Sequence, residues 1–158
     1  MPGDVGHPYR LLFVCTGNTC RSPLAEAIAA REILRRGWSA VEVASAGTAA
    51  YPGGSASEGS LRAAARNGLD LSAHRSRPLS AELIAWADVV LTMSASHLAQ
   101  ARAAGATHAD LLPHFATGDE GGVPDPFGGS DEIYEATYRA LHEFVVAALD
   151  RLEAVVAP

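Results

Sequence analysis

The stretch from Val14 to Pro23, with the sequence VCTGNTCRSP, constrains the fold more than any other part of the chain. An apolar run over residues 11–14 leads into it, and an alanine-rich helical pattern follows it. A strand, a tight loop and a helix start in this order gather backbone N–H groups around a small anion. A thiol, Cys15, and a guanidinium, Arg21, stand at the two ends of the loop. The stretch is therefore interpreted as a phosphate-binding loop that carries its own nucleophile.

The other residues of this loop suit the same interpretation. Gly17 permits a positive φ, and Asn18 tolerates the left-handed region and has an amide to pin the loop. Ser22 is predicted as the helix N-cap, with its hydroxyl also within reach of the thiolate, and Pro23 as the first helical residue. Residues expected to line the anion are Thr16, Gly17, Asn18, Thr19, Cys20 and Ser22. A cysteine taken alone would more often be a buried structural residue, so the interpretation depends on the whole run.

The run CTGNTCRSP resembles the active-site loop of the low-molecular-weight protein tyrosine phosphatases, and most of all that of the bacterial protein-arginine phosphatases. The resemblance extends to SAGT at residues 45–48 and DPFGGS at residues 125–130, so it covers nearly the whole chain. It implies that Ser45 hydrogen-bonds Asn18, although spacing alone fits an ordinary turn serine equally well. It also implies that His74 is a packing and hydrogen-bonding residue rather than a catalyst.

Strand-like apolar runs alternate with helical patterns, which predicts one α/β domain over residues 1–158. We expect a central four-stranded parallel sheet with helices on both faces, and a flexible N-terminal extension over residues 1–9. Strands are predicted at 10–14, 41–44, 88–93 and 110–112, and helices at 23–36, 57–67, 80–86, 94–104 and 131–156. Leu34 and Ile133 are predicted to face the core. The phosphate-binding loop follows the first strand and so lies at the carboxyl edge of the sheet.

A second candidate element is the glycine-rich loop over residues 117–130, which contains Pro124-Asp125-Pro126. Two prolines restrict the backbone around Asp125, and a rigid mount suits a proton donor. Asp119 and Glu120 are the competing acids, and a plain Asp-Pro turn is the structural alternative. Phe127 is expected either to line the pocket mouth or only to anchor the loop.

Composition limits the classes of partner and cofactor. With 12 Lys and Arg against 18 Asp and Glu the net charge is −6, so net charge gives no support for binding nucleic acid. We find no signal-peptide pattern and no apolar run of membrane-spanning length, and expect a cytoplasmic protein without a membrane partner. The six histidines are scattered, so neither a metal nor another cofactor is expected.

The expected reaction follows from these residues. Cys15 attacks phosphorus, Arg21 and the loop N–H groups stabilise the phosphoryl oxygens, and Asp125 protonates the leaving atom. The resulting cysteinyl-phosphate is hydrolysed, with phosphorylated proteins as substrates and phosphate ion as product. Cys20 is expected either to form a reversible disulfide with Cys15 or to pack as a small hydrophobic residue.

Substrate choice depends on Thr19. The resemblance implies an aliphatic residue here in tyrosine phosphatases and a threonine in arginine phosphatases, and a buried hydroxyl is less favourable beside a phenyl ring. Phosphoarginine is therefore the favoured substrate and phosphotyrosine the alternative. An arsenate reductase is less favoured because no cysteine follows Cys20, and a non-catalytic phosphate-binding module has no need of both Cys15 and Asp125.

Overall fold

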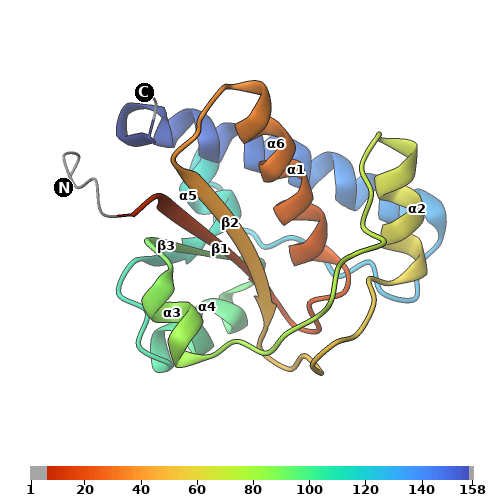
Figure 1. Ribbon diagram of the computed structural model, residues 1–158. Coiled ribbons are helices and arrows are strands. Elements are labelled where there is room, and N and C mark those ends of the chain that lie inside the picture. Colours follow the sequence, from red (N-terminus) through yellow and green to blue (C-terminus); the bar gives the residue numbers. More distant parts are fainter. Residues whose placement is uncertain (1–6, 157–158) are drawn as a thin grey trace.

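Four parallel strands form the centre of the computed structural model, which describes residues 7–156 (Figure 1). The strand order across the sheet is β2-β1-β3-β4. The strands are β1 (Tyr9–Cys15), β2 (Val41–Gly47), β3 (Val89–Thr92) and β4 (Ala109–Leu111). All three neighbouring pairs are parallel, so the loops after β1, β2 and β3 leave from the same edge.

Helices cover both faces of this sheet, as predicted (Figure 1). The helices are α1 (Arg21–Arg35), α2 (Glu58–Arg66), α3 (Ala81–Trp86), α4 (Ala95–Ala103), α5 (Leu112–Thr117) and α6 (Asp131–Val156). One face is covered by α1, α5 and α6, with α2 packed against α6, and the other face by α3 and α4. No helix within residues 7–156 is long and apolar enough to span a membrane.

The alternation of side chains along β1 sets the direction of its last residue. Leu11, Phe13 and Cys15 belong to the core between the sheet and α1, whereas Leu12 and Val14 belong to the core on the α3 and α4 side. Because Cys15 is in phase with Leu11 and Phe13, its thiol lies on the face that α1 covers. The strand therefore delivers the thiol beneath the N-terminus of α1.

The start of α1 differs from the prediction. The helix begins at Arg21, and Cys20 is the N-cap residue, without a side-chain cap hydrogen bond. The prediction of Ser22 as N-cap is wrong, because the loop closes two residues earlier and releases the Ser22 hydroxyl for other contacts. Pro23 is the third helical residue rather than the first, where its missing N–H still falls in the turn that lacks intrahelical partners.

Three further expectations need correction. Tyr9 is the first residue of β1 rather than part of a flexible extension, while residues 1–6 of that extension lie outside the described residues. Leu34 is 81% exposed, because the buried face of α1 ends at Ile33 and the next residue turns roughly 100° away from it. Ile133 is 51% exposed for the same reason, since the buried face of α6 begins at Tyr134.

Gly59 allows α2 to pack closely against α6. A side chain built at Gly59 would overlap the ring of Tyr134, which is itself 4% exposed. We expect Gly59→Ala to lower the free energy of unfolding by about 1–3 kcal/mol, because the buried ring has little room to move. An exposed helical position would show the opposite sign, since alanine is there favoured over glycine by about 1 kcal/mol.

Urea denaturation of the wild type and Gly59→Ala measures this change. Ala65→Ser, at an exposed position of the same helix, is the control for substitution in α2. A gain in stability for Gly59→Ala would contradict the close packing.

Candidate active site

Cys15 ends β1 and is 2% exposed. Its Sγ atom lies 2.9 Å from the Oγ atom of Ser22, which projects from the first turn of α1. A hydroxyl at this distance donates to a thiolate, and the helix N-terminus favours negative charge. The surroundings of the thiol therefore suit a nucleophile.

The loop between Cys15 and α1 is organised around Asn18, which is fully buried and has a φ of 56°. Its Nδ2 donates to Ser22 Oγ at 2.8 Å and to Ser45 Oγ at 2.9 Å. The sequence prediction that Ser45 bonds Asn18 is confirmed by this contact. The positive φ belongs to Asn18 and not to Gly17, so the side-chain hydrogen bonds stabilise a conformation that non-glycine residues seldom adopt.

Two residues of the loop over residues 71–79 complete the contacts of Asn18. Its backbone oxygen lies 2.7 Å from His74 Nε2, and its Oδ1 accepts the backbone N–H of Arg77 at 2.9 Å. His74 thus contacts the backbone of the loop and does not line the pocket. Its geometry fits the packing and hydrogen-bonding role expected for it.

The end of β2 approaches the same loop closely. A side chain at Gly47 would overlap the carbonyl oxygen of Thr16, and the backbone N–H of Ala49 donates to that oxygen at 2.9 Å. Ser45 Oγ in turn donates to Glu26 of α1 at 2.5 Å. Glu26 was not predicted as a site residue, and no sequence motif marks it.

Arg21 is a buried cation, 5% exposed, with part of its hydrogen-bonding capacity unused. Its Nη1 donates to the carbonyl oxygen of Val123 at 2.9 Å, and its Nη2 donates to Thr16 Oγ1 at 3.4 Å. Its Nε is buried and has no partner among the described residues. An unpartnered buried N–H is costly, and an anion in the pocket would accept it. The guanidinium therefore fits a bound phosphate group.

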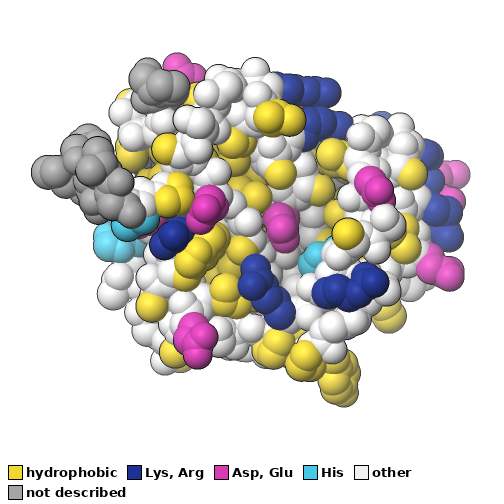
Figure 2. Space-filling view, viewed as in Figure 1, with side chains coloured by type: hydrophobic (Ala, Val, Ile, Leu, Met, Phe, Trp, Pro, Cys, Tyr) yellow, Lys and Arg dark blue, Asp and Glu magenta, His cyan; other side chains and the backbone are white. Residues whose placement is uncertain are grey.

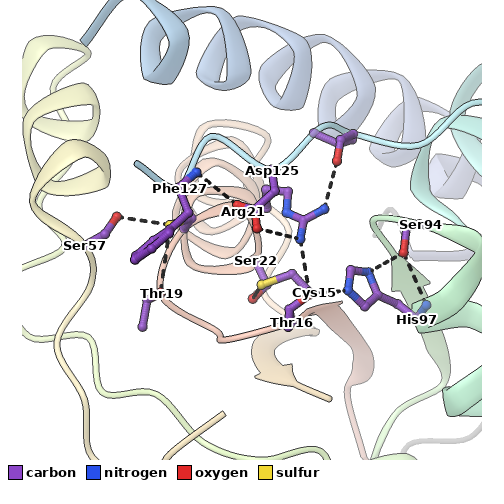
Figure 3. Close-up of polar contacts among 12 residues, drawn as sticks. Cys15, Thr16, Thr19, Arg21, Ser22, Ser57, Ser94, His97, Asp125 and Phe127 are labelled. Atoms are coloured by element: carbon purple, nitrogen blue, oxygen red, sulfur yellow. Dashed lines mark hydrogen bonds and ion pairs between the residues drawn. The ribbon is translucent and has the colours of Figure 1, made fainter. Parts of the chain in front are cut away.

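The pocket beside Arg21 has a volume of about 230 Å³. Figure 3 shows Cys15, Arg21 and Asp125 facing one another, with the Phe127 ring to one side. Phe127 is 73% exposed, so it forms part of the pocket rim. The pocket is lined by Cys15, Thr16, Gly17, Thr19, Cys20, Arg21, Asp125 and Phe127. The groove of about 830 Å³ along β2 and α3 is larger, but no cysteine is among its lining residues.

Asp125 is the acid that the structure brings to the pocket. Its Oδ1 accepts the N–H of Phe127 at 3.1 Å, and its Oδ2 lies 3.7 Å from Arg21 Nη2. The loop that carries it is anchored just after β3, since Val123 N–H donates to the Met93 carbonyl oxygen at 2.8 Å. The two other candidate acids, Asp119 and Glu120, are both exposed and do not line the pocket.

Cys20 is the second thiol of the pocket, and both cysteines are free. Its Sγ donates to Ser57 Oγ at 3.2 Å and lies 3.5 Å from Tyr134 Oη. Thr19 Oγ1 is 3.8 Å from the same sulfur. Ser57, the N-cap of α2, and Tyr134 of α6 were not predicted as neighbours of the site, because both lie far from Cys20 in the sequence.

His97 is a further residue that the sequence reasoning missed. It lies in the first turn of α4 and is 4% exposed. Its Nε2 lies 2.8 Å from Thr16 Oγ1 and its Nδ1 lies 2.9 Å from Ser94 Oγ. Burial, together with the nearby charge of Arg21, lowers the pKa of His97 from 6.5 to about 4, while Asp125 acts in the opposite direction. The ring is therefore neutral at pH 7.

Other parts of the described chain show no rival site. No group of three His, Cys, Asp or Glu side chains within residues 7–156 is arranged to hold a metal ion. On the face seen in Figure 2, dark blue and magenta side chains are interspersed and form no single large basic area. The thiol, the guanidinium, the loop amides and the carboxylate around the small pocket together suit nucleophilic attack on a tetrahedral anion.

Comparison with known proteins gives consistent matches over most of the chain. The sequence model of the family described as low molecular weight phosphotyrosine protein phosphatase matches residues 10–157. A protein-arginine-phosphatase from Geobacillus stearothermophilus is 38% identical, covering 92% of this chain and 97% of that protein. One from Bacillus subtilis (strain 168) is 41% identical, covering 85% of this chain and 91% of that protein. The protein-tyrosine-phosphatase Wzb of Salmonella typhi is 35% identical, covering 84% and 86%.

Solved structures agree with these matches. A mutant YwlE arginine phosphatase with a phosphorylated active-site serine has a TM-score of 0.86 and 38% identity, covering 91% of this chain and 95% of that one. The YwlE arginine phosphatase from Geobacillus stearothermophilus has a TM-score of 0.82 and 36% identity, covering 93% and 94%. The Wzb tyrosine phosphatase of Escherichia coli K30 in complex with sulphate has a TM-score of 0.78 and 33% identity, covering 90% and 97%.

The lowered pKa of His97 makes stability depend on pH. Between pH 6.5 and about 4 the unfolded chain binds a proton at this histidine and the folded chain does not. The free energy of unfolding therefore falls as the pH falls through this window, and is unaffected by His97 above it. We expect the loss between pH 7 and pH 5 to be smaller in His97→Gln than in the wild type by about 2 kcal/mol.

Urea denaturation at the two pH values measures this difference. His108→Gln, which changes an exposed histidine, is the control. An equal pH dependence in the wild type and His97→Gln would show that the buried ring does not resist protonation.

Proposed function

The chain belongs to the low molecular weight phosphotyrosine protein phosphatase family and is a cysteine-dependent protein phosphatase, and we propose that its substrate is phosphoarginine in proteins. The observation that carries the choice of substrate is the Thr19 hydroxyl in the wall of the small pocket. The relatives named protein-arginine-phosphatase, at 38% and 41% identity, support the same substrate.

Binding of the phosphoryl group is assigned to the loop between Cys15 and α1. In this assignment the backbone N–H groups of residues 16–20 and the N-terminus of α1 donate hydrogen bonds to the phosphoryl oxygens. The Nε–H of Arg21, without a partner among the described residues, donates to a phosphoryl oxygen. Val123 and Thr16 hold the other two nitrogens of Arg21, so the guanidinium is oriented before the substrate binds.

The first chemical step is attack of the Cys15 thiolate on phosphorus. Ser22 Oγ, at 2.9 Å, donates a hydrogen bond to the sulfur, and the start of α1 stabilises its negative charge. The S–P bond forms as the bond from phosphorus to the leaving nitrogen breaks. Asp125 gives its proton to that nitrogen, and the arginine side chain departs protonated.

The second step hydrolyses the cysteinyl-phosphate. Asp125, now a carboxylate, accepts a proton from a water molecule that attacks phosphorus, and the S–P bond breaks. Inorganic phosphate leaves and the thiolate is restored. The Asp125 carboxylate, held by its bond to the Phe127 N–H and by the flanking prolines, is placed for both proton transfers.

Selectivity for arginine is assigned to the polar wall of the pocket. Thr19 contributes a hydroxyl, and Asp125 contributes a carboxyl group on the rim where the leaving group must lie. A guanidinium forms hydrogen bonds with both, whereas a phenyl ring offers none to the hydroxyl, which then keeps only its 3.8 Å contact with Cys20 Sγ, at a cost of about 1–3 kcal/mol. The pocket therefore favours phosphoarginine over phosphotyrosine.

Phosphotyrosine is the second candidate substrate, and one observation favours it. Phe127 is 73% exposed on the pocket rim and presents a ring against which a phenol can stack. The tyrosine phosphatase Wzb, which matches at 35% identity, belongs to the same group of relatives.

Two further proposals concern the compartment in which the protein acts and its partners. The reaction needs a reduced Cys15, which suits a cytoplasmic enzyme, since thiols stay reduced in that compartment. The charge of −6 and the interspersed charges in Figure 2 give no support for a nucleic-acid partner.

The role of Cys15 predicts that replacing its thiol abolishes turnover but not the binding of phosphate. Cys15→Ser should lower kcat at least about a thousandfold, because a serine hydroxyl is far less nucleophilic than a thiolate in this setting. Binding of inorganic phosphate, measured by calorimetry, should persist because Arg21 and the loop N–H groups are unchanged. Circular dichroism checks the fold, and full activity of the variant would refute the assignment.

The role of Thr19 predicts that its replacement weakens the preference for phosphoarginine over phosphotyrosine. Thr19→Ile removes the hydroxyl, and we expect the ratio of kcat/KM for a phosphoarginine peptide to that for a phosphotyrosine peptide to fall about tenfold or more. Thr19→Ser keeps the hydroxyl and is the matched control, which should stay close to the wild type. An unchanged ratio in Thr19→Ile would remove the argument for selectivity.

A further inference from the structure

We propose that His97 is a positioning residue that holds Arg21 in its anion-binding orientation through the hydroxyl group of Thr16. The chain of contacts begins at His97 Nε2, which lies 2.8 Å from Thr16 Oγ1. The same Thr16 oxygen accepts from Arg21 Nη2 at 3.4 Å. Figure 3 shows the imidazole beside Thr16, on the side of the pocket away from Phe127.

The imidazole is fixed at both of its nitrogens. Ser94, the N-cap of α4, lies 2.9 Å from His97 Nδ1 and also accepts the backbone N–H of His97 at 3.3 Å. The residue is 4% exposed, so the ring has little freedom to rotate. Thr16, by contrast, is an exposed residue whose hydroxyl would otherwise turn into solvent. His97 is therefore the rigid member of the pair and sets the position of the Thr16 hydroxyl.

The position of that hydroxyl matters because two groups compete for Arg21 Nη2. Thr16 Oγ1 lies on one side at 3.4 Å, and the Asp125 carboxylate lies on the other at 3.7 Å. Without the Thr16 contact, the guanidinium is drawn toward the carboxylate, and its Nε turns away from the anion. The contact with His97 thus keeps Arg21 directed at the phosphoryl group and leaves Asp125 available for proton transfer.

The segment from Met93 to His97 supports both halves of the site. Its first residue accepts the Val123 N–H from the Asp125 loop, and the Val123 carbonyl oxygen accepts from Arg21. Its last residue holds Thr16 of the nucleophile loop. The residues from the end of β3 to the first turn of α4 therefore contact two partners of Arg21, Val123 and Thr16.

This inference rests on the proposed roles of Arg21 and Asp125, but not on the choice between phosphoarginine and phosphotyrosine. The test therefore uses p-nitrophenyl phosphate as substrate and inorganic phosphate as competitive inhibitor. A wild type that hydrolyses neither this compound nor a phosphoarginine peptide would overturn the proposed function. A wild type that is active while the variants below behave alike would overturn the role of His97 alone.

Two variants of His97 separate its contacts. The amide nitrogen of glutamine falls near the position of Nε2 and keeps the bond to Thr16, whereas that of asparagine falls near Nδ1 and keeps only the bond to Ser94. We expect His97→Asn to lower kcat/KM about tenfold and to weaken inhibition by phosphate, and His97→Gln to restore most of both. A role in packing alone would favour neither amide, and equal activity of the two variants overturns the proposal.

A double-mutant cycle with Thr16 tests whether His97 acts through the hydroxyl. In a Thr16→Val background, His97→Asn should cause no further loss of kcat/KM, and additive losses would overturn the proposal. Should His97→Asn fail to fold, the exposed position 16 gives the test by itself. Thr16→Val should have a kcat/KM about tenfold lower than Thr16→Ser, which keeps the hydroxyl, and equal activity of these two variants overturns the proposal.

Discussion

The site depends on one buried asparagine. Asn18 occupies the left-handed region and lies at the midpoint of the loop that surrounds the pocket. Its amide and backbone oxygen contact α1, β2 and the segment over residues 74–77, so three separate parts of the chain fix one residue. A left-handed conformation costs about 1–2 kcal/mol in a non-glycine residue, and these hydrogen bonds offset it. The conformation of the loop between Cys15 and α1 therefore rests on Asn18.

Electrostatics explain why Arg21 is buried without a close ion pair. A fully paired guanidinium would have no capacity left for a phosphoryl group, and a fully unpaired one would destabilise the fold. Arg21 lies between these limits, with a carbonyl oxygen and a hydroxyl as neutral partners and the nearest carboxylate at 3.7 Å. The neutral His97 fits this arrangement, because a second cation behind Thr16 would repel Arg21.

The sequence predicted the sheet, the nucleophile loop and Asp125 because each has a local signature. The apolar runs, the loop spacing and the Pro-Asp-Pro context can be recognised within a few residues. The exact start of α1 was not recognised, because both Ser22 and Cys20 are followed by helical residues and only closure of the loop decides between them. The short helix α5 was missed for a similar reason, since six residues give too little periodicity.

His97, Tyr134 and Glu26 were missed in the sequence, because only the tertiary structure brings these three side chains to the site. Each sits on a helix with an ordinary pattern, and only the packing of that helix brings the side chain to the loop. The contact of Thr16 with His97 could not be predicted from neighbouring residues, since the two lie 81 positions apart in the sequence.

The pleat of β1 has a consequence for how the chain can vary in length. Cys15 shares its side of the strand with Leu11 and Phe13, so deleting or inserting a single residue between them would turn the sulfur toward α3 and α4. Movement of neighbouring side chains could not restore the position of the sulfur, because successive residues of a strand point to opposite faces of the sheet. The number of residues between Leu11 and Cys15 is thus dictated by the reaction that the thiol performs.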